Sequence, residues 1–209
     1  MKNFALGNKD IKIGLDTLAA KDTHVAEAIE LVGYPQERIN PQGFSTVLRV
    51  IVGQQLSVKA AASIWVRVQT LAGENAGTKD YALIADEDLR SAGLSRQKVN
   101  YVRSLCERVD DGTLDFAALG TMSNDDAVKA ITAVKGLGVW SAHIYLMFSL
   151  GRADIMPVGD LAVRVGVGRI VGHEDRPTEK ECDAIGARWA PYRSMMALMA
   201  WHYYSNAPL

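Results

Sequence analysis

The sequence contains too few cysteines for a disulfide framework. Only Cys106 and Cys182 occur among 209 residues, so these residues alone cannot build a four-cysteine zinc or iron–sulfur site. Each cysteine lies within a helical pattern, which favours a packing or surface role. No Cys, His and Asp residues stand at the spacing of a catalytic zinc site.

Long apolar runs and an excess of one charge are also missing. No run reaches the roughly 20 apolar residues of a membrane-spanning helix, and the opening residues MKNFALGNKD lack the apolar core of a secretory signal. We therefore expect a cytoplasmic protein without a membrane partner. The net charge of -1 does not mark a nucleic-acid-binding protein, nor does it exclude one, because the placement of charges matters more than their sum.

The sequence also lacks sustained alternation of apolar and polar residues, so it gives no sign of a β-sheet. Apolar residues instead recur at helical spacing, and 48% hydrophobic content is enough for a core. The predicted fold is all-α. Capping residues and glycines divide the pattern into helices over residues 23–33, 44–55, 57–73, 86–94, 96–112, 123–133, 139–150, 160–172, 178–190 and 193–205.

Two glycines stand between two of these predicted helices, in VKGLGVWSA from Val134 to Ala142. If the second helix begins near Gly138, its first amides have no partner within the helix. Those amides, the helix dipole and the bare backbone at Gly136 and Gly138 would bind an anion closely. Lys135 adds a positive charge, and Leu137 can pack back to hold the turn. The alternative is a turn that uses glycine for its geometry alone.

A second polar feature is Asp160, which follows Pro157 and Gly159 and precedes an apolar helix. At this position the helix dipole and free amides favour the ionised carboxylate. Taken alone, such an aspartate is most simply an N-cap. A carboxylate in this setting can also act in catalysis, so both interpretations stay open on the residues themselves.

A family resemblance connects these two features. The stretch VKGLGVWSA resembles the helix–hairpin–helix motif of DNA repair glycosylases, and Asp160 follows Gly136 by 24 residues, about the separation in that superfamily. RVIVGQQLSVKAAASIW (residues 49–65) and ARWAPYRSMMALMAWHYYS (residues 187–205) are similar to its DNA-3-methyladenine glycosylase II branch. The resemblance extends in order from about Gln42 to the C-terminus.

The resemblance implies a two-lobed helical bundle with a DNA cleft between the lobes. We expect a central lobe over residues 42–133 and a second lobe formed by residues 1–41 with 134–209, which would carry the hairpin and Asp160. Some members of this branch have an additional N-terminal β-rich domain. The segment before Gln42 is too short for that domain, so we expect the compact form.

The activity that the resemblance implies is that of a monofunctional DNA glycosylase of base excision repair. It would flip alkylated purines such as 3-methyladenine out of duplex DNA and release them by hydrolysis. Asp160 would stabilise the positive charge that develops on the sugar and orient or deprotonate the attacking water. Trp140 stands where the lyase branches have a Schiff-base lysine, so no covalent imine is expected.

The resemblance also suggests residues that hold the flipped base. Trp140 and Tyr192 are candidates for stacking on an electron-poor alkylpurine. Ile144 stands where some relatives have an aromatic pocket residue. Trp65 and Trp201 lie on apolar helix faces and are expected to fill the core.

Further residues are expected to contact the DNA itself. Gln55 would fill the gap left by the flipped base, with Gln54 supporting the loop or contacting a base; alternatively, both glutamines only tie a helix end together. Phosphate would bind at the hairpin residues Lys135, Gly136, Leu137 and Gly138. Main-chain oxygens of Thr132, Val134 and Leu137 would hold a structural Na+ or K+, and no other cofactor is required.

The expected partner is duplex DNA containing alkylated bases, bound by a monomer. Two other functions remain open. One is a non-catalytic helix–hairpin–helix module that only binds the DNA backbone. The other is a glycosylase for deaminated or oxidised purines.

Overall fold

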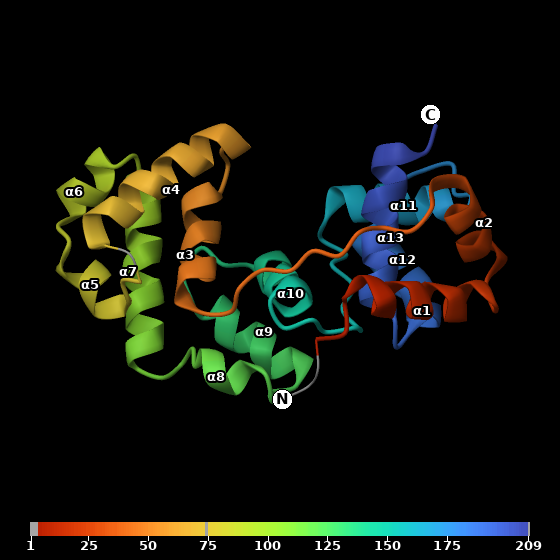
Figure 1. Cartoon of the computed structure of the whole chain (residues 1–209), viewed down its shortest axis with the longest axis horizontal. Coiled ribbons are helices and arrows are strands. Elements are labelled where there is room, and N and C mark those ends of the chain that lie inside the picture. Colours follow the sequence, from red (N-terminus) through yellow and green to blue (C-terminus); the bar gives the residue numbers. More distant parts are fainter. Residues whose placement is uncertain (1–3, 74, 209) are drawn as a thin grey trace. The chain divides into compact units, whose positions relative to one another are not determined.

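The computed structural model describes residues 4–73 and 75–208, and within these ranges the chain is helical, with no strand. The all-α prediction is therefore confirmed. The helices shown in Figure 1 are α1 (Asn8–Ala19), α2 (Thr23–Val32), α3 (Phe44–Gly53), α4 (Val58–Ala72), α5 (Thr78–Leu83), α6 (Asp86–Ser91), α7 (Arg96–Asp110), α8 (Phe116–Leu119), α9 (Asn124–Thr132), α10 (Val139–Phe148), α11 (Leu161–Ile170), α12 (Glu179–Gly186), the short 3-10 helix η1 (Ala187–Trp189) and α13 (Arg193–Asn206).

The chain forms two compact units. One contains Met1–Asn40 with His143–Leu209, and the other contains Pro41–Ala142. The second boundary differs from the predicted one at 133/134, because the hairpin packs within the Pro41–Ala142 unit, where the backbone amide of Lys135 is bonded to Ser104. Helix α10 begins in one unit and ends in the other.

Several helices begin where the sequence places a capping side chain. Asp22, Ser57, Ser95 and Ser123 each accept a hydrogen bond from a backbone amide in the first turn of their helix. The sequence analysis did not predict α1, α5 and α8. Helix α1 has no side-chain cap, and α5 and α8 contain only 6 and 4 residues.

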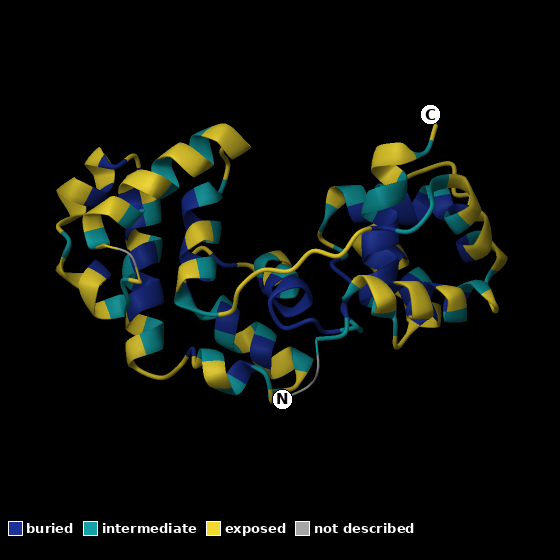
Figure 2. Ribbon diagram, in the orientation of Figure 1, coloured by how far each residue is buried: buried dark blue, intermediate teal, exposed yellow. Residues whose placement is uncertain are grey.

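In the unit formed by the two ends of the chain, α13 is the central helix. It packs against α1, α2 and α11, and its residues from Ser194 to Ala200 are buried (Figure 2). Gly166 of α11 allows the closest approach, since a Cβ atom there would lie 2.1 Å from the carbonyl oxygen of Ala200. This contact brings the middle of α11 against the middle of α13.

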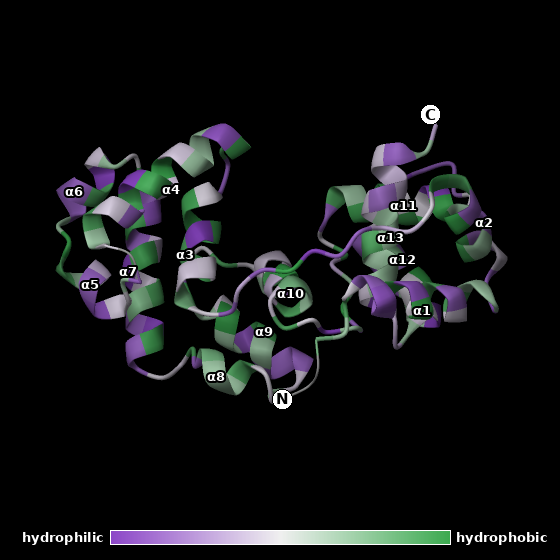
Figure 3. Cartoon of the chain, in the orientation of Figure 1, coloured by the Kyte–Doolittle hydropathy of each residue, from purple (hydrophilic) through white to green (hydrophobic). Residues whose placement is uncertain are grey.

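In the Pro41–Ala142 unit, α7 is the long helix against which α3, α5 and α6 pack. Helix α7 carries both hydrophobic and hydrophilic patches (Figure 3), and Val99, Val102 and Leu105 are among its buried residues. Helix α4 is more exposed, with Val68 as its buried residue. Among the described residues, no helix combines the length and apolar character required to cross a membrane.

Candidate active site

The hairpin between α9 and α10 is anchored by apolar residues that are buried in the protein. Val134 is fully buried and Leu137 nearly so, and the Leu137 amide donates to the Val134 carbonyl at 3.2 Å. Gly136 has a φ of 83°, and a Cβ atom there would lie 2.3 Å from the ring of Tyr101. Only glycine fits this position without displacing the ring.

The outer side of the hairpin is open. Lys135, Gly136 and Gly138 are exposed, and a Cβ atom added at Gly138 would meet nothing within 4 Å. The helix begins directly afterwards at Val139, which is 54% exposed. Bare backbone, first-turn amides and a lysine therefore occur together on an accessible surface, which is the arrangement that binds phosphate.

The turn after α3 contacts this hairpin. Gln54 is half-buried, and its Nε2 donates to the Gly136 carbonyl at 2.8 Å. Gln55 is exposed and has a φ of 55°, a left-handed conformation that is uncommon outside glycine. The structure thus gives Gln54 a loop-supporting contact and leaves the side chain of Gln55 on the surface.

Asp160 caps α11, as the N-cap interpretation of the sequence required. Its Oδ1 accepts the Val163 amide at 3.0 Å. The same oxygen accepts the indole Nε1–H of Trp201 at 3.0 Å. These bonds fix the orientation of a half-buried carboxylate at the N-terminus of a helix. A cap of this kind is compatible with catalysis, because it positions the carboxylate without sealing it inside the protein.

Trp201 is not the core residue that the sequence suggested. It is only partly buried, its ring lies 5.8 Å from that of Phe148, and the guanidinium of Arg38 lies 5.6 Å from its centroid. Arg38 comes from the extended segment after α2, and nothing in the local sequence indicated this contact. The indole is therefore fixed by an aromatic ring and a cation while it donates to Asp160.

The loop that leads to Asp160 is attached to the start of α13. Arg193 forms a two-bond ion pair with Asp154, with Nε to Oδ1 at 2.7 Å and Nη2 to Oδ2 at 2.9 Å. Buried Ser194 donates to the Arg152 carbonyl at 2.6 Å and accepts the Ile155 amide at 2.9 Å. The sequence analysis missed these positioning residues, although the segment PYRS contains both Arg193 and Ser194.

A Trp201→Phe substitution tests whether the indole positions Asp160. Phenylalanine keeps the ring but removes the donor to Oδ1, so we expect a fall in catalytic turnover of about tenfold, the loss for one interaction of about 1.4 kcal/mol. Single-turnover kinetics with alkylated DNA measure the fall in turnover. Urea titration measures the free energy of unfolding, and thus any loss of packing. Unchanged turnover with a large stability loss would show that Trp201 serves only packing.

Comparisons with known proteins identify the family of this chain. Residues 48–191 match the family model described as HhH-GPD superfamily base excision DNA repair protein. A DNA-3-methyladenine glycosidase structure from Bacillus halodurans is 35% identical, with a TM-score of 0.85, covering 91% of this chain and 88% of that one. The Schizosaccharomyces pombe 3-methyladenine DNA glycosylase in complex with abasic DNA is 25% identical, with a TM-score of 0.78, covering 90% of this chain and 95% of that one.

The chain belongs to the HhH-GPD superfamily. Another relative, the putative DNA-3-methyladenine glycosylase YfjP of Bacillus subtilis, is 26% identical over 76% of this chain. The chain spans 58% of the length of that relative. The family resemblance stated from the hairpin, Asp160 and the two flanking segments is therefore confirmed.

Within this HhH-GPD chain, the predicted base-stacking residues take different positions. Trp140 is 45% exposed in the first turn of α10, so it is not a core residue. Ile144 follows one helical turn later and is half-buried. Trp65, also expected in the core, is only partly buried.

Tyr192 lies at the start of α13, beside α1. It lines a small pocket of about 150 Å³ with Asp22, Arg188 and Trp189, and Asp160 is not part of that lining. Trp189 is fully buried and donates from Nε1 to Asp22 Oδ2 at 2.9 Å. Burial opposes ionisation of Asp22, but this bond and the charge of Arg188 outweigh it and lower the pKa of the carboxyl.

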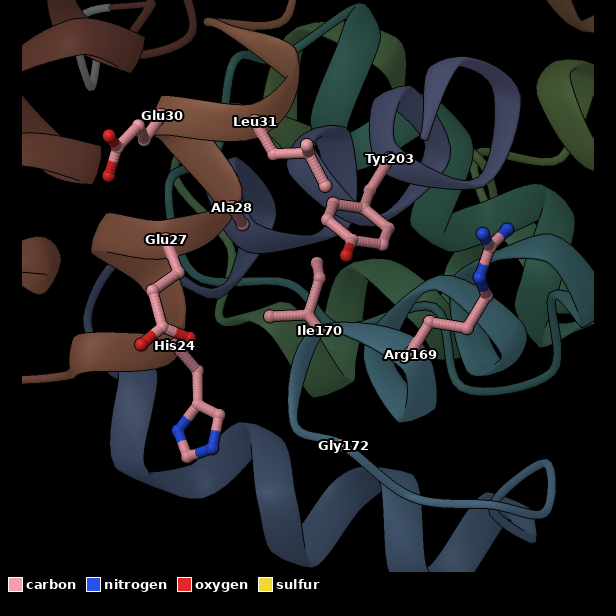
Figure 4. Close-up of a pocket in the computed structure, with 9 residues that line it drawn as sticks. All are labelled: His24, Glu27, Ala28, Glu30, Leu31, Arg169, Ile170, Gly172 and Tyr203. Atoms are coloured by element: carbon pink, nitrogen blue, oxygen red, sulfur yellow. The ribbon is translucent and has the colours of Figure 1, made fainter. Parts of the chain in front are cut away.

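A larger pocket, of about 710 Å³, lies where α2 meets α11 and α13. Its lining includes His24, Glu27, Leu31, Arg169 and Tyr203 (Figure 4). None of the predicted site residues lines it. We therefore do not place the active site there, although a large pocket is often the first candidate.

The described residues contain no group of three or more His, Cys, Asp and Glu side chains arranged to hold a metal ion. Burial raises the pKa of Cys106 to about 11 and that of Cys182 to about 11, so both thiols are unreactive near neutral pH. Burial, with the nearby charge of Arg193, lowers the pKa of His143. The lowered pKa favours the neutral imidazole of His143.

Proposed function

We propose that this protein is a monofunctional DNA glycosylase of base excision repair. It flips alkylated purines such as 3-methyladenine out of duplex DNA and releases them by hydrolysis, acting as a monomer in the cytosol or nucleoid. The observation that carries this proposal is the Asp160 carboxylate, fixed at a helix N-terminus by Val163 and Trp201 in an HhH-GPD chain. The names of the relatives support the choice of 3-methyladenine.

Asp160 acts at the sugar. As the base leaves, positive charge develops at the anomeric carbon, and a fixed carboxylate stabilises that charge more than it stabilises the neutral substrate. The carboxylate also orients a water molecule or takes its proton. A purine alkylated at N3 or N7 is already cationic and leaves readily, so its release needs no separate general acid.

Trp140 holds the base. An exposed indole gives an electron-rich face for a cationic purine, and Ile144 and Tyr192 supply apolar and aromatic walls. We expect Trp140→Ala to reduce base excision about tenfold or more, since stacking contributes about 1–3 kcal/mol per base, while binding to undamaged duplex changes little. Excision rates and fluorescence-anisotropy titrations measure the two effects. A greater loss of duplex binding than of excision would contradict this role.

The hairpin binds the DNA backbone. Lys135 contributes charge, and the backbone at Gly136, Leu137 and Gly138 approaches a phosphate closely. Gln55 enters the gap left by the flipped base, while Gln54 supports the loop through Gly136. Because phosphate contacts of this kind release counterions, duplex affinity should fall as salt increases.

We propose that a monovalent cation binds at the same hairpin. The carbonyl of Val134 already accepts the Leu137 amide, and its second lone pair, with the carbonyls of Thr132 and Leu137, suits Na+ or K+. A bound cation would add positive charge opposite the phosphate. The chain requires no other cofactor for the proposed hydrolysis.

A substrate panel tests the proposal against its two alternatives. The protein is incubated with duplexes containing 3-methyladenine, 7-methylguanine, hypoxanthine, 1,N6-ethenoadenine or an oxidised purine, and free bases are separated by chromatography. Release of methylated purines supports the proposal. Release of only deaminated or oxidised purines would favour the alternative substrate class, and binding without release would favour a non-catalytic module.

Borohydride trapping tests the monofunctional mechanism in the same reactions. Trp140 stands where the lyase branches have a lysine and has no amine to form an imine. We therefore expect no borohydride-trapped covalent complex and no enzyme-dependent strand cleavage. A trapped adduct would contradict hydrolysis by water.

A further inference from the structure

Three residues at three-residue intervals lie along one face of α7. Lys98, Tyr101 and Ser104 follow each other at the spacing that aligns side chains on one side of a helix. Tyr101 and Ser104 contact the hairpin, and Lys98 contacts the last turn of α3, directly before the Gln54–Gln55 turn. This part of the argument concerns only the Pro41–Ala142 unit.

Lys98 contacts the end of α3. Its Nζ donates to the Val52 carbonyl at 2.7 Å, just before the chain turns at Gln54 and Gln55. A lysine here satisfies one of the carbonyls left without a partner at a helix C-terminus and favourably opposes the helix dipole. Lys98 therefore fixes the base of the turn that displays Gln55.

Tyr101 and Ser104 contact the hairpin. The ring of Tyr101 fills the space behind Gly136. Ser104, only 4% exposed, accepts the backbone amide of Lys135 at 3.0 Å. These contacts fix the rear of the hairpin, opposite its exposed side.

A direct bond between the two loops completes this arrangement. Gln54 Nε2 donates to the Gly136 carbonyl at 2.8 Å. The turn and the hairpin are thus joined to each other and also to the same helix. A shift of either loop would break contacts on α7 as well as the bond between the loops.

We propose that Lys98, Tyr101 and Ser104 are positioning residues that hold the Gln55 turn and the hairpin at a fixed spacing from each other. Phosphate binding at the hairpin then places Gln55 for entry into the duplex, so that both contacts form together. The proposal rests on the DNA-binding roles given above. It adds that the spacing of the two loops, set by α7, determines how strongly the protein prefers DNA with a displaced or missing base, because preorganised contacts lose less entropy on binding.

The first test removes a contact behind the hairpin and measures how far Gln55 enters the duplex. Ser104→Ala removes the acceptor for Lys135 but lies on no DNA-facing surface. The probe is a duplex that contains a tetrahydrofuran abasic analogue beside 2-aminopurine, whose fluorescence rises when the base is unstacked. At saturating protein we expect Ser104→Ala to lower the fluorescence rise, by up to about threefold when a coupling near 0.7 kcal/mol is lost.

The matched control is Ser91→Ala, which removes a hydroxyl that donates to the Glu87 carbonyl of its own helix. It should leave the amplitude unchanged. The fluorescence amplitude is measured at saturating protein, where all the duplex is bound. A variant that only binds more weakly therefore gives the same fluorescence amplitude as the wild type. A wild-type amplitude for Ser104→Ala in a folded protein would overturn the proposal.

The second test changes the turn side. Lys98→Met keeps the aliphatic chain but loses the bond to Val52, whereas Lys98→Arg retains a donor. We expect Lys98→Met to reduce the ratio of affinities for abasic and undamaged duplex about threefold. Lys98→Arg should restore this ratio. The exposed control Lys79→Met should leave it unchanged. Equal preference in Lys98→Met and wild type would count against the proposal.

A double-mutant cycle separates coupling from general destabilisation. Affinities for the abasic duplex are measured for Ser104→Ala, Gln54→Ala and the double variant, with urea unfolding as the check on folding. Coupled loops predict non-additive losses, and additive losses would refute the coupling. None of these readouts requires base release, so an inactive wild type would overturn the proposed function while leaving this test interpretable.

Discussion

The Asp160→Asn protein is expected to lose base release by about 10²- to 10³-fold or more, the range seen when a preorganised electrostatic group is removed from an active site. Asparagine has the same shape and keeps a side-chain oxygen that can accept the Val163 amide, so the cap of α11 persists. What is lost is the negative charge next to the developing cation. Release of free base from methylated duplex, under single-turnover conditions, measures the effect.

DNA binding provides the internal control for this variant. We expect Asp160→Asn to bind duplex as well as wild type, because removal of a carboxylate takes nothing from phosphate contacts. Asp115→Asn is a matched variant, since Asp115 caps α8 by accepting the Ala117 and Ala118 amides and has no proposed role in chemistry. Equal release by Asp160→Asn and wild type would remove Asp160 from the mechanism.

The Gly136→Ala protein is expected to bind all duplexes weakly, damaged or not. A φ of 83° costs an alanine about 1–2 kcal/mol, and its methyl group would displace the Tyr101 ring. The hairpin must shift, and we expect duplex affinity to fall about tenfold or more, as a loss of 1.4 kcal/mol or more implies. Anisotropy titrations over a salt series measure both the affinity and its salt slope.

Gly138→Ala separates hairpin geometry from direct contact. The space around Gly138 is open, and its backbone does not have a positive φ. We therefore expect near wild-type unfolding energy together with weaker DNA binding, because the new methyl group would stand on the phosphate-facing side. Wild-type binding by both glycine variants would show that the hairpin does not contact DNA.

Local signals in the sequence predicted much of the fold. Ser57, Ser95 and Ser123 mark helix starts because their hydroxyls accept first-turn amides, an interaction set within a few residues. Helix α1 has no such cap, so it depends on tertiary packing of residues such as Ile11 and Leu15. A helix stabilised in this way leaves only a weak local signal.

The candidate site shows the same division between local and distant contacts. The glycine hairpin and Asp160 are local features of the sequence, but the residues alone left a plain turn and a plain N-cap open, and the family resemblance gave both a predicted role. Trp201 donates to Asp160 across 41 residues, and Lys98 reaches Val52 across 46. An apolar helix pattern containing a tryptophan predicts core packing, and only the close approach of α11 and α13 shows otherwise. Positioning residues of this kind require the folded structure.

The most direct test is a time course of free 3-methyladenine released from methylated duplex DNA by wild type and by Asp160→Asn. We predict first-order release by the wild type, leaving an intact strand with an abasic site, and release near the uncatalysed rate from the variant. Tight binding of the duplex by the wild-type protein without release of any base would contradict hydrolysis at Asp160.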